Sequence, residues 1–84
     1  MSGENLSAPE GLLLAMHNMG AVHEKASKTV QELAEITKIS LERLTGILTD
    51  SEEHGYVYSF TDIQGSRRYY LTGLGIIRIC STYT

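Results

Sequence analysis

Two stretches with helical periodicity, separated by a turn of three residues, are the feature that most constrains the fold of this chain. Thr29 followed by Glu32 forms the pattern of a capping box, so we expect a helix to begin after Thr29. Ser40 is a good N-cap for the next helix, and Gly55 supplies the positive φ at which helices commonly end. The segment 37–39 between them has room only for a turn. This part of the chain is therefore predicted to form a helix, a tight turn and a second helix.

The apolar residues of this helix pair recur at the spacing of a face that packs on a core. We expect the buried residues to be Val30, Leu33, Ala34 and Ile36 in the first helix and Leu41, Leu44, Ile47 and Leu48 in the second. Gly46 lies inside the second helix, where glycine costs about 1 kcal/mol relative to alanine. We therefore expect Gly46 to mark a close approach of another backbone segment.

A strand pattern follows the helix pair directly. Between residues 56 and 61 aromatic side chains alternate with smaller ones, which predicts a strand with two different faces. The segment 62–66 contains Gly65 and is predicted to be the loop of a hairpin. Residues 67–71 form the expected return strand, and Thr72 is the expected N-cap of a last helix.

A further helix is expected near the N-terminus. Ser7, Pro9 and Glu10 are start signals, and Met19 with Gly20 marks the end. The connector that follows has room for a short strand at 26–28. Taken together, these elements predict an α+β fold of the winged helix-turn-helix type. It has a three-helix core, a wing of two or three strands and a C-terminal helix. We expect one domain over 1–84, with a flexible N-terminal segment at 1–6.

Composition narrows the function classes. Apolar residues make up 42% of the chain and charged residues 20%, which is typical of a globular domain. The sequence has no apolar run long enough to span a bilayer and no secretory pattern, and its single cysteine fits a reducing compartment. We therefore expect a cytoplasmic protein. The net charge of −3 counts against DNA binding, because nucleic-acid-binding domains usually carry a basic excess.

Three stretches resemble the winged-helix transcriptional regulators of the MarR and ArsR families and their archaeal relatives. Residues 29–35 read T-V-Q-E-L-A-E, similar to the T-x-x-E-L-A-E start of their second helix. Ile39-Ser40, Leu44, Leu48 and Gly55-Tyr56-Val57 are similar to their recognition helix and the start of their wing. Residues 67–75 read R-R-Y-Y-L-T-G-L-G, similar to R-x-Y-x-L-T-x-x-G at the end of the wing. The resemblance implies a DNA-binding transcriptional regulator.

Candidate DNA-binding residues follow from the places of cations and hydroxyls in this pattern. Arg67 and Arg68 on the wing are candidates for phosphate contacts. Arg43, Thr45 and Thr49, with Ser40, are candidates for contacts with base edges or the backbone on the third helix. The remaining candidates flank the second helix and are expected at the DNA backbone: Lys28, Thr29 and Lys38. The alternative is a set of ordinary solvated residues, which the acidic balance of segment 40–55 favours.

Other site types are weaker. The aromatic residues of the strands could stack on single-stranded nucleic acid, but cross-strand pairing within a hairpin explains them more simply. His17, His23 and His54 lack the spacing of a metal site, and no catalytic constellation stands out. We expect neither enzymatic activity nor a cofactor.

The last helix carries more apolar surface than a small core requires. We expect Leu74, Ile77 and Cys80 to lie at an interface of a homodimer. The first interpretation is therefore a homodimeric regulator that binds double-stranded DNA. The alternative is a winged helix that serves as a protein-interaction or dimerisation module without binding DNA.

Overall fold

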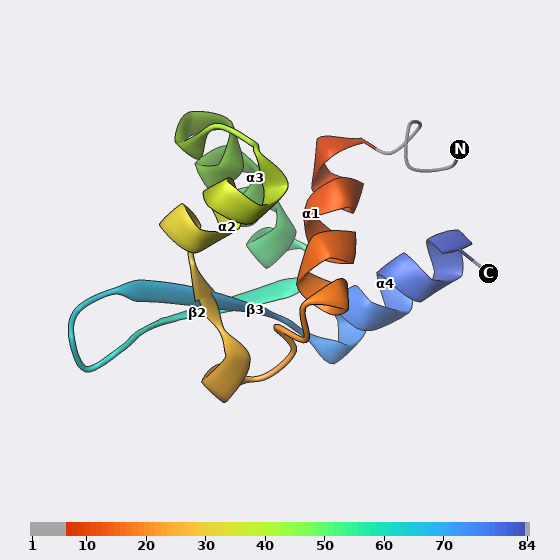
Figure 1. The fold of residues 1–84 in the computed structure, drawn as a ribbon. Coiled ribbons are helices and arrows are strands. Elements are labelled where there is room, and N and C mark those ends of the chain that lie inside the picture. The colour runs from red at the N-terminus through yellow and green to blue at the C-terminus, as the bar shows by residue number, and fades with distance from the viewer. Residues whose placement is uncertain (1–6, 84) are drawn as a thin grey trace.

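The computed structural model describes residues 7–83, and the side chains of 7–81. Its elements confirm the predicted order of helices and strands (Figure 1). They are α1 (Ala8–Asn18), the short 3-10 helix η2 (Glu24–Ala26), β1 (Lys28–Thr29), α2 (Val30–Thr37), α3 (Leu41–Glu53), β2 (Val57–Thr61), β3 (Arg67–Leu71) and α4 (Gly73–Tyr83). The fold class is α+β, as the sequence predicts.

Each predicted helix start is confirmed by a cap. Ser7 Oγ accepts a hydrogen bond from the backbone N–H of Glu10, and the Glu10 carboxylate accepts one from the backbone of Ser7. Thr29 and Glu32 form the same reciprocal box at the start of α2. Ser40 caps α3 by accepting from the backbone N–H of Arg43 at 3.3 Å. These bonds satisfy backbone donors that the first turn of a helix leaves unpaired.

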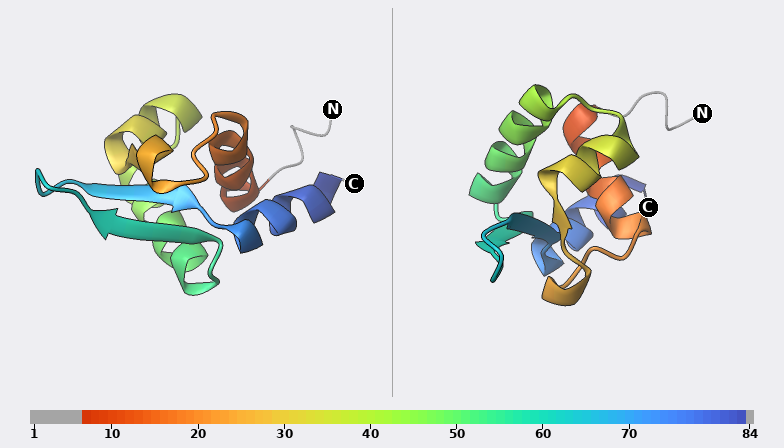
Figure 2. Two further views of the ribbon diagram at one scale, coloured as in Figure 1. Left: turned by 90° about the horizontal axis from the view of Figure 1, so that it is seen from below. Right: turned by 60° about the vertical axis from the view of Figure 1, so that its left-hand side comes forward.

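The strands form one antiparallel sheet in the order β1-β3-β2. In the hairpin, Tyr58 lies opposite Tyr70, and Thr61 lies opposite Arg67 next to the loop. The short strand β1 extends the sheet on the other side of β3, where Thr29 lies opposite Arg68. The hairpin loop projects beyond the helices, and α3 and the hairpin lie along the same side of the molecule (Figures 1 and 2).

The core fills the space between the helices and the base of the sheet. Its buried apolar residues come from every main element: Leu12, Leu13, Met16, Ala21, Leu33, Leu44, Leu48, Val57, Leu71 and Ile79. No helix within residues 7–83 has the length and apolar character that crossing a membrane requires.

Gly75, and not Gly46, is where a backbone segment comes close. A Cβ on Gly75 would lie against the carbonyl oxygen of Tyr56 and 2.7 Å from Leu71 Cδ1. Gly46 is exposed, with nothing near the position of a Cβ. The expectation for Gly46 was wrong because it lies two residues after buried Leu44, about 200° around the helix.

Three further expectations are corrected. Ile36 is half exposed, because it lies about 200° around α2 from the half-buried Ala34. Leu41 is 47% exposed, because it is the first residue of α3 and no preceding turn covers it. The predicted strand at 26–28 is displaced to Lys28–Thr29, since the backbone and hydroxyl of Ser27 both donate to Glu24 and close a 3-10 turn there.

Candidate nucleic-acid interface

The helix-turn-helix is formed by α2, a turn at Lys38 and α3. Lys38 ends α2 in the left-handed region at φ 64°, and its N–H still donates to Ala34. This residue redirects the chain, so that only three residues separate the end of α2 from the start of α3. One side of α3 packs on the core through Leu44, Leu48 and Ser51, which leaves its opposite side exposed along the whole helix.

The charges on the exposed side of α3 are unevenly distributed. Lys38 and Arg43, near its N-terminal end, form no side-chain hydrogen bond or ion pair with any described residue. Asp50 and Glu53 lie in the C-terminal half, and Glu42 is the acidic residue of the first turn. The cations of this helix-turn-helix therefore lie at the end where the helix begins, together with the positive end of its dipole.

The predicted hydroxyl residues are engaged in local bonds. Thr45 Oγ1 donates to the carbonyl of Leu41 at 2.8 Å, and Thr49 Oγ1 donates to that of Thr45 at 2.9 Å. Their methyl groups and lone pairs remain available, but their protons are used within the helix. Thr29 and Ser40 are the N-caps of α2 and α3, so the hydroxyl group of each stabilises the start of a helix.

Arg68 connects the hairpin to the segment before α2. Its Nε donates to Ser27 Oγ at 3.0 Å, and its Nη2 donates to the Ser27 carbonyl at 2.7 Å. The guanidinium also lies 3.8 Å from Glu32 and 3.6 Å from Asp62. Ser27 is buried, so these bonds satisfy polar atoms that water does not reach. The guanidinium of Arg68 thus joins three segments of the fold.

Arg67 is held less firmly, at the junction of the hairpin and α3. Its Nη2 donates to Ser59 Oγ at 2.8 Å and lies 3.7 Å from Glu52, whose carboxylate accepts from the same serine at 2.6 Å. The Arg67 side chain is 57% exposed. A long, exposed ion pair of this kind is worth about 0–1 kcal/mol, so another anion can displace it.

The predicted DNA-binding residues thus fall into two groups. Lys38, Ser40 and Arg43 lie around the turn between α2 and α3, and Thr45 and Thr49 continue along α3. The second group lies along β3 of the hairpin. It comprises Arg67 and Arg68, with Lys28 and Thr29 of β1 opposite Tyr69 and Arg68. The Lys28 side chain has no bonding partner among residues 7–81.

Sequence reasoning missed the partners of the wing arginines. Ser27, Ser59 and Asp62 carry no motif, and their roles depend on contacts between segments far apart in the chain. The alternation of β2 does indicate that Ser59 shares the inward face of Val57, where a polar residue requires a partner.

The strand aromatics form cross-strand pairs. The rings of Tyr58 and Tyr70 lie 5.4 Å apart and tilted, and Phe60 lies 6.3 Å from Tyr70. These are distances at which aromatic pairs attract each other. Their arrangement agrees with the simpler of the two expectations, in which the rings stabilise the hairpin.

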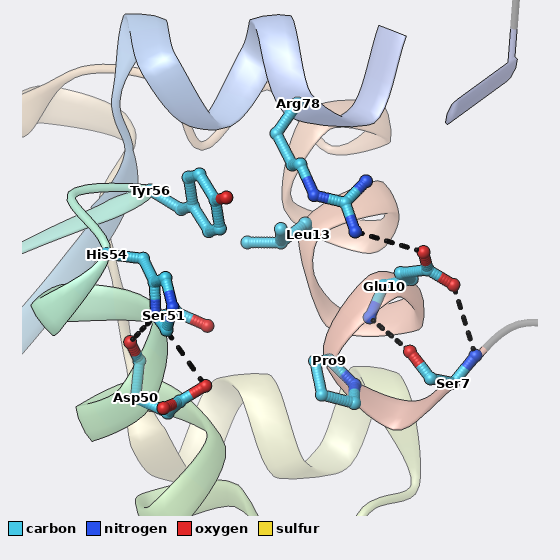
Figure 3. Close-up of a pocket in the computed structure, with 9 residues that line it drawn as sticks. All are labelled: Ser7, Pro9, Glu10, Leu13, Asp50, Ser51, His54, Tyr56 and Arg78. Carbon is cyan, nitrogen blue, oxygen red and sulfur yellow. Dashed lines mark hydrogen bonds and ion pairs between the residues drawn. The ribbon is translucent and has the colours of Figure 1, made fainter. Parts of the chain in front are cut away.

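A shallow hollow of about 290 Å³ lies on another part of the surface, between α1, the end of α3 and α4 (Figure 3). In it, Arg78 donates to Glu10 at 3.2 Å, and the ring of His54 stacks on Tyr56 at 5.5 Å. Hydrogen bonds from the Ser7 backbone and the Arg78 guanidinium hold the pKa of Glu10 below its usual value. Within residues 7–81 no three His, Cys, Asp or Glu side chains gather as metal ligands would.

The outer side of α4 is apolar. Leu74, Ile77 and Cys80 are spaced three residues apart, which places them on one side of the helix, and all three are exposed. Ile79 and Gly75 lie on the opposite side and are buried. The residues predicted at an interface are therefore accessible on one surface.

Comparison with known proteins identifies the fold. No protein-family model matches the sequence, and no curated protein matches it. Among solved structures, a MarR-family transcriptional regulator from Silicibacter pomeroyi is 23% identical, with a TM-score of 0.74 over 99% of this chain and 53% of its own. BpsR of Bordetella bronchiseptica is 13% identical, with a TM-score of 0.79 over 99% of this chain and 60% of its own. The DNA binding of BpsR is described as regulated by 6-hydroxynicotinic acid.

MepR of Staphylococcus aureus, solved in complex with DNA, is 17% identical, with a TM-score of 0.71 over 94% of this chain and 63% of its own. The chain thus has the winged-helix fold of MarR-type regulators and spans 53–63% of the length of these three proteins.

Proposed function

We propose that this protein binds double-stranded DNA and acts as a transcriptional regulator, with α3 in the major groove and the hairpin along the neighbouring backbone. The observation that carries the proposal is the outer side of α3. This helix occupies the second position of a helix-turn-helix, the position that enters the groove in such motifs. Its outer side is exposed over the full length of the helix. The fold is similar to that of MepR, which was solved in complex with DNA.

The charge distribution supports an approach by the N-terminal end of α3. Recognition helices contact base edges mainly through their N-terminal residues. Here that end holds Lys38 and Arg43, which have no carboxylate partner among the described residues, whereas Asp50 and Glu53 lie farther along. In this arrangement Arg43 and Thr45 face the bases, Ser40 and Thr49 lie beside them, and Lys38 faces phosphate.

At the hairpin, Arg67 is the stronger candidate for a phosphate contact. Its ion pair with Glu52 is long and exposed, and a phosphate can replace that carboxylate. Lys28 and Thr29 in β1 would contact the backbone from the other side of β3. Arg68 would contribute mainly by fixing the hairpin, because its guanidinium is already bound to Ser27.

We also propose that two copies associate through α4, with Leu74, Ile77 and Cys80 in the contact. These exposed residues provide an apolar surface that a second copy can bury, and a dimer would double the number of cations available to one DNA molecule. Sedimentation over a range of concentrations tests the dimer. We expect Ile77→Asp to give a folded monomer, and a wild-type monomer at every concentration would refute the contact.

A second candidate function rests on the acidic residues of α3. Glu42, Asp50 and Glu53 outnumber Arg43 on its exposed side, which suits a basic protein surface better than a phosphate backbone. In this alternative the winged helix is a protein-interaction or dimerisation module and does not bind DNA.

Titration of a random-sequence duplex decides between these functions. With three or four phosphate contacts, we expect affinity to fall about a hundredfold between about 50 and about 200 mM salt. The double variant Lys38→Ala, Arg43→Ala should lower the affinity and flatten the salt dependence. The matched control Lys25→Ala removes a cation on η2, away from α3, and should change neither. Absence of binding at low salt would refute DNA binding and support the second candidate.

A further inference from the structure

Gly46 lies inside α3, where glycine lowers the stability of a helix relative to alanine. Its φ is not positive, and a Cβ at this position would meet no atom within 4 Å. It lies two residues from buried Leu44 and two from buried Leu48, about 200° around the helix from each, and so on the side opposite the core. No packing contact within the described chain explains this glycine.

Two charged side chains flank Gly46 from the preceding turn of the helix. Glu42 lies about 40° to one side of Gly46 around the helix axis, and Arg43 lies about 60° to the other side. Both are exposed, and neither side chain forms a hydrogen bond or ion pair with a described residue. Adjacent residues of a helix do not face each other, so the two charges do not form a pair. The outer side of α3 thus presents an acceptor and a donor with a gap between them.

This arrangement lies at the end of α3 that is proposed to meet DNA. Glu42 and Arg43 belong to the first turn, and recognition helices contact base edges mainly through their N-terminal residues. In the right-hand view of Figure 2, α3 runs along the edge of the molecule, and no other element of the described chain lies outside it. A base pair can therefore approach the helix more closely at Gly46 than at a residue with a side chain.

The two flanking side chains match the major-groove edge of a G·C base pair. Guanine presents the acceptors N7 and O6 there, to which an arginine can donate. Cytosine presents its N4 amino group, from which a glutamate can accept. Cytosine is also the one base whose major-groove edge has a donor and no acceptor, because adenine adds N7 and thymine presents O4. A carboxylate therefore meets no repulsion from cytosine and some from each other base.

We propose that Glu42 accepts a hydrogen bond from cytosine N4 in the major groove, and that the missing side chain at Gly46 lets α3 come close enough for this contact. This inference rests on the proposed DNA binding. In this role Glu42 acts against the expectation from net charge. It weakens the attraction to the phosphate backbone at every sequence, and it strengthens binding where a cytosine lies opposite it. The carboxylate therefore raises specificity while it lowers non-specific affinity.

Selection from a pool of duplexes with a randomised central segment tests the base preference. We expect the wild type to enrich cytosine at one position of each bound site. Glu42→Gln should enrich adenine at that position, because an amide can pair with both N6 and N7 of adenine. The matched control Glu35→Gln removes an exposed carboxylate on α2 and should select the wild-type sequence. Unchanged selection by Glu42→Gln, or a wild-type pool with no enriched position, would overturn the cytosine contact, while DNA binding would stand.

Affinities distinguish a base contact from a solvated charge. We expect Glu42→Ala to bind the selected duplex about tenfold more weakly than the wild type does, and a random-sequence duplex about threefold more tightly. A carboxylate that only repels phosphates would give the same gain on both duplexes, and that result would refute the contact. If the wild type binds no duplex at low salt, the proposed function fails and this inference fails with it.

Gly46→Ala tests the close approach. Alanine should raise the unfolding temperature by about 5 °C because it favours the helix, and yet lower the affinity for the selected duplex about tenfold. The matched control Gly11→Ala adds a Cβ in α1, where it also meets no atom within 4 Å. It should stabilise the fold in the same way and leave DNA affinity unchanged. If Gly46→Ala binds the selected duplex as tightly as the wild type, α3 does not use this gap and the proposal fails.

Discussion

The turn between α2 and α3 and the loop end of the hairpin each carry two of the cations expected to bind DNA, but only one of these pairs is engaged within the described chain. Lys38 and Arg43 have no partner among the residues that the structure describes. Arg67 and Arg68 donate to serine oxygens and lie within 4 Å of carboxylates. The two regions carry equal numbers of these cations, but only those at the turn are without a partner among the described residues.

The difference follows from how each region is held together. The turn between the helices is closed by backbone geometry at Lys38 and by the Ser40 cap, so its cationic side chains have no structural task. The hairpin projects from the core, and its strand pairing with the segment before α2 covers the two residues of β1. Side-chain bonds add to this attachment, and Arg68 supplies those to Ser27.

The largest effect that would sharpen this comparison is on stability. Replacing Arg68 with Ala leaves the buried oxygens of Ser27 without a donor and places Glu32 and Asp62 near each other without a cation. We expect a loss of about 2 kcal/mol in the free energy of unfolding, measured by urea denaturation. Arg67→Ala, the matched control, should cost about 0.5 kcal/mol. Equal losses would show that the two arginines are held alike.

The next effect is on DNA affinity and concerns the available cations. Arg43→Ala removes a guanidinium with no partner in the described chain, so nothing within the protein compensates its loss. We expect affinity for duplex DNA to fall about tenfold. Arg67→Ala should lower it by about threefold, because the gain from a phosphate contact is offset by the lost contact with Glu52. A larger effect from Arg67 than from Arg43 would break the comparison.

The sequence predicts the fold far better than it predicts the site. Caps such as Ser7 and Thr29 and the glycine at position 55 act within four residues, so local patterns reveal them. Gly75 belongs to the stretch that resembles the MarR and ArsR families, but its close approach to Tyr56 is visible only in the folded chain. The bonds of Arg68 to Ser27 span 41 positions, and no periodicity reports such a contact. Exposure of Leu41 likewise depends on where the core ends.

A smaller effect is expected at the pair that restrains Arg67. In Glu52→Gln the carboxylate charge disappears, while the amide can still accept from Ser59. We expect DNA affinity to rise about threefold and the salt dependence to steepen by about one ion, because Arg67 becomes available to a phosphate. Glu35→Gln, which removes an exposed carboxylate on α2, controls for the change in net charge. The same increase in both variants would assign the effect to net charge alone.

The smallest effect is expected at acidic pH and concerns Glu10. Its carboxylate is paired with Arg78, far from both the turn and the hairpin. Because folding lowers the pKa of Glu10, its ionised form stabilises the native state above the ordinary pKa of about 4.5. That contribution is lost as the pH falls through the lowered folded value, when protonation removes the capping-box acceptor and the partner of Arg78. We expect the urea midpoint of Glu10→Gln to decline less than that of the wild type below about pH 4.5. Parallel decline in both proteins would mean that Glu10 is not among the groups that cause acid unfolding. Because this carboxylate is solvated, the shift should be smaller than any produced at Arg68, which bonds to buried atoms.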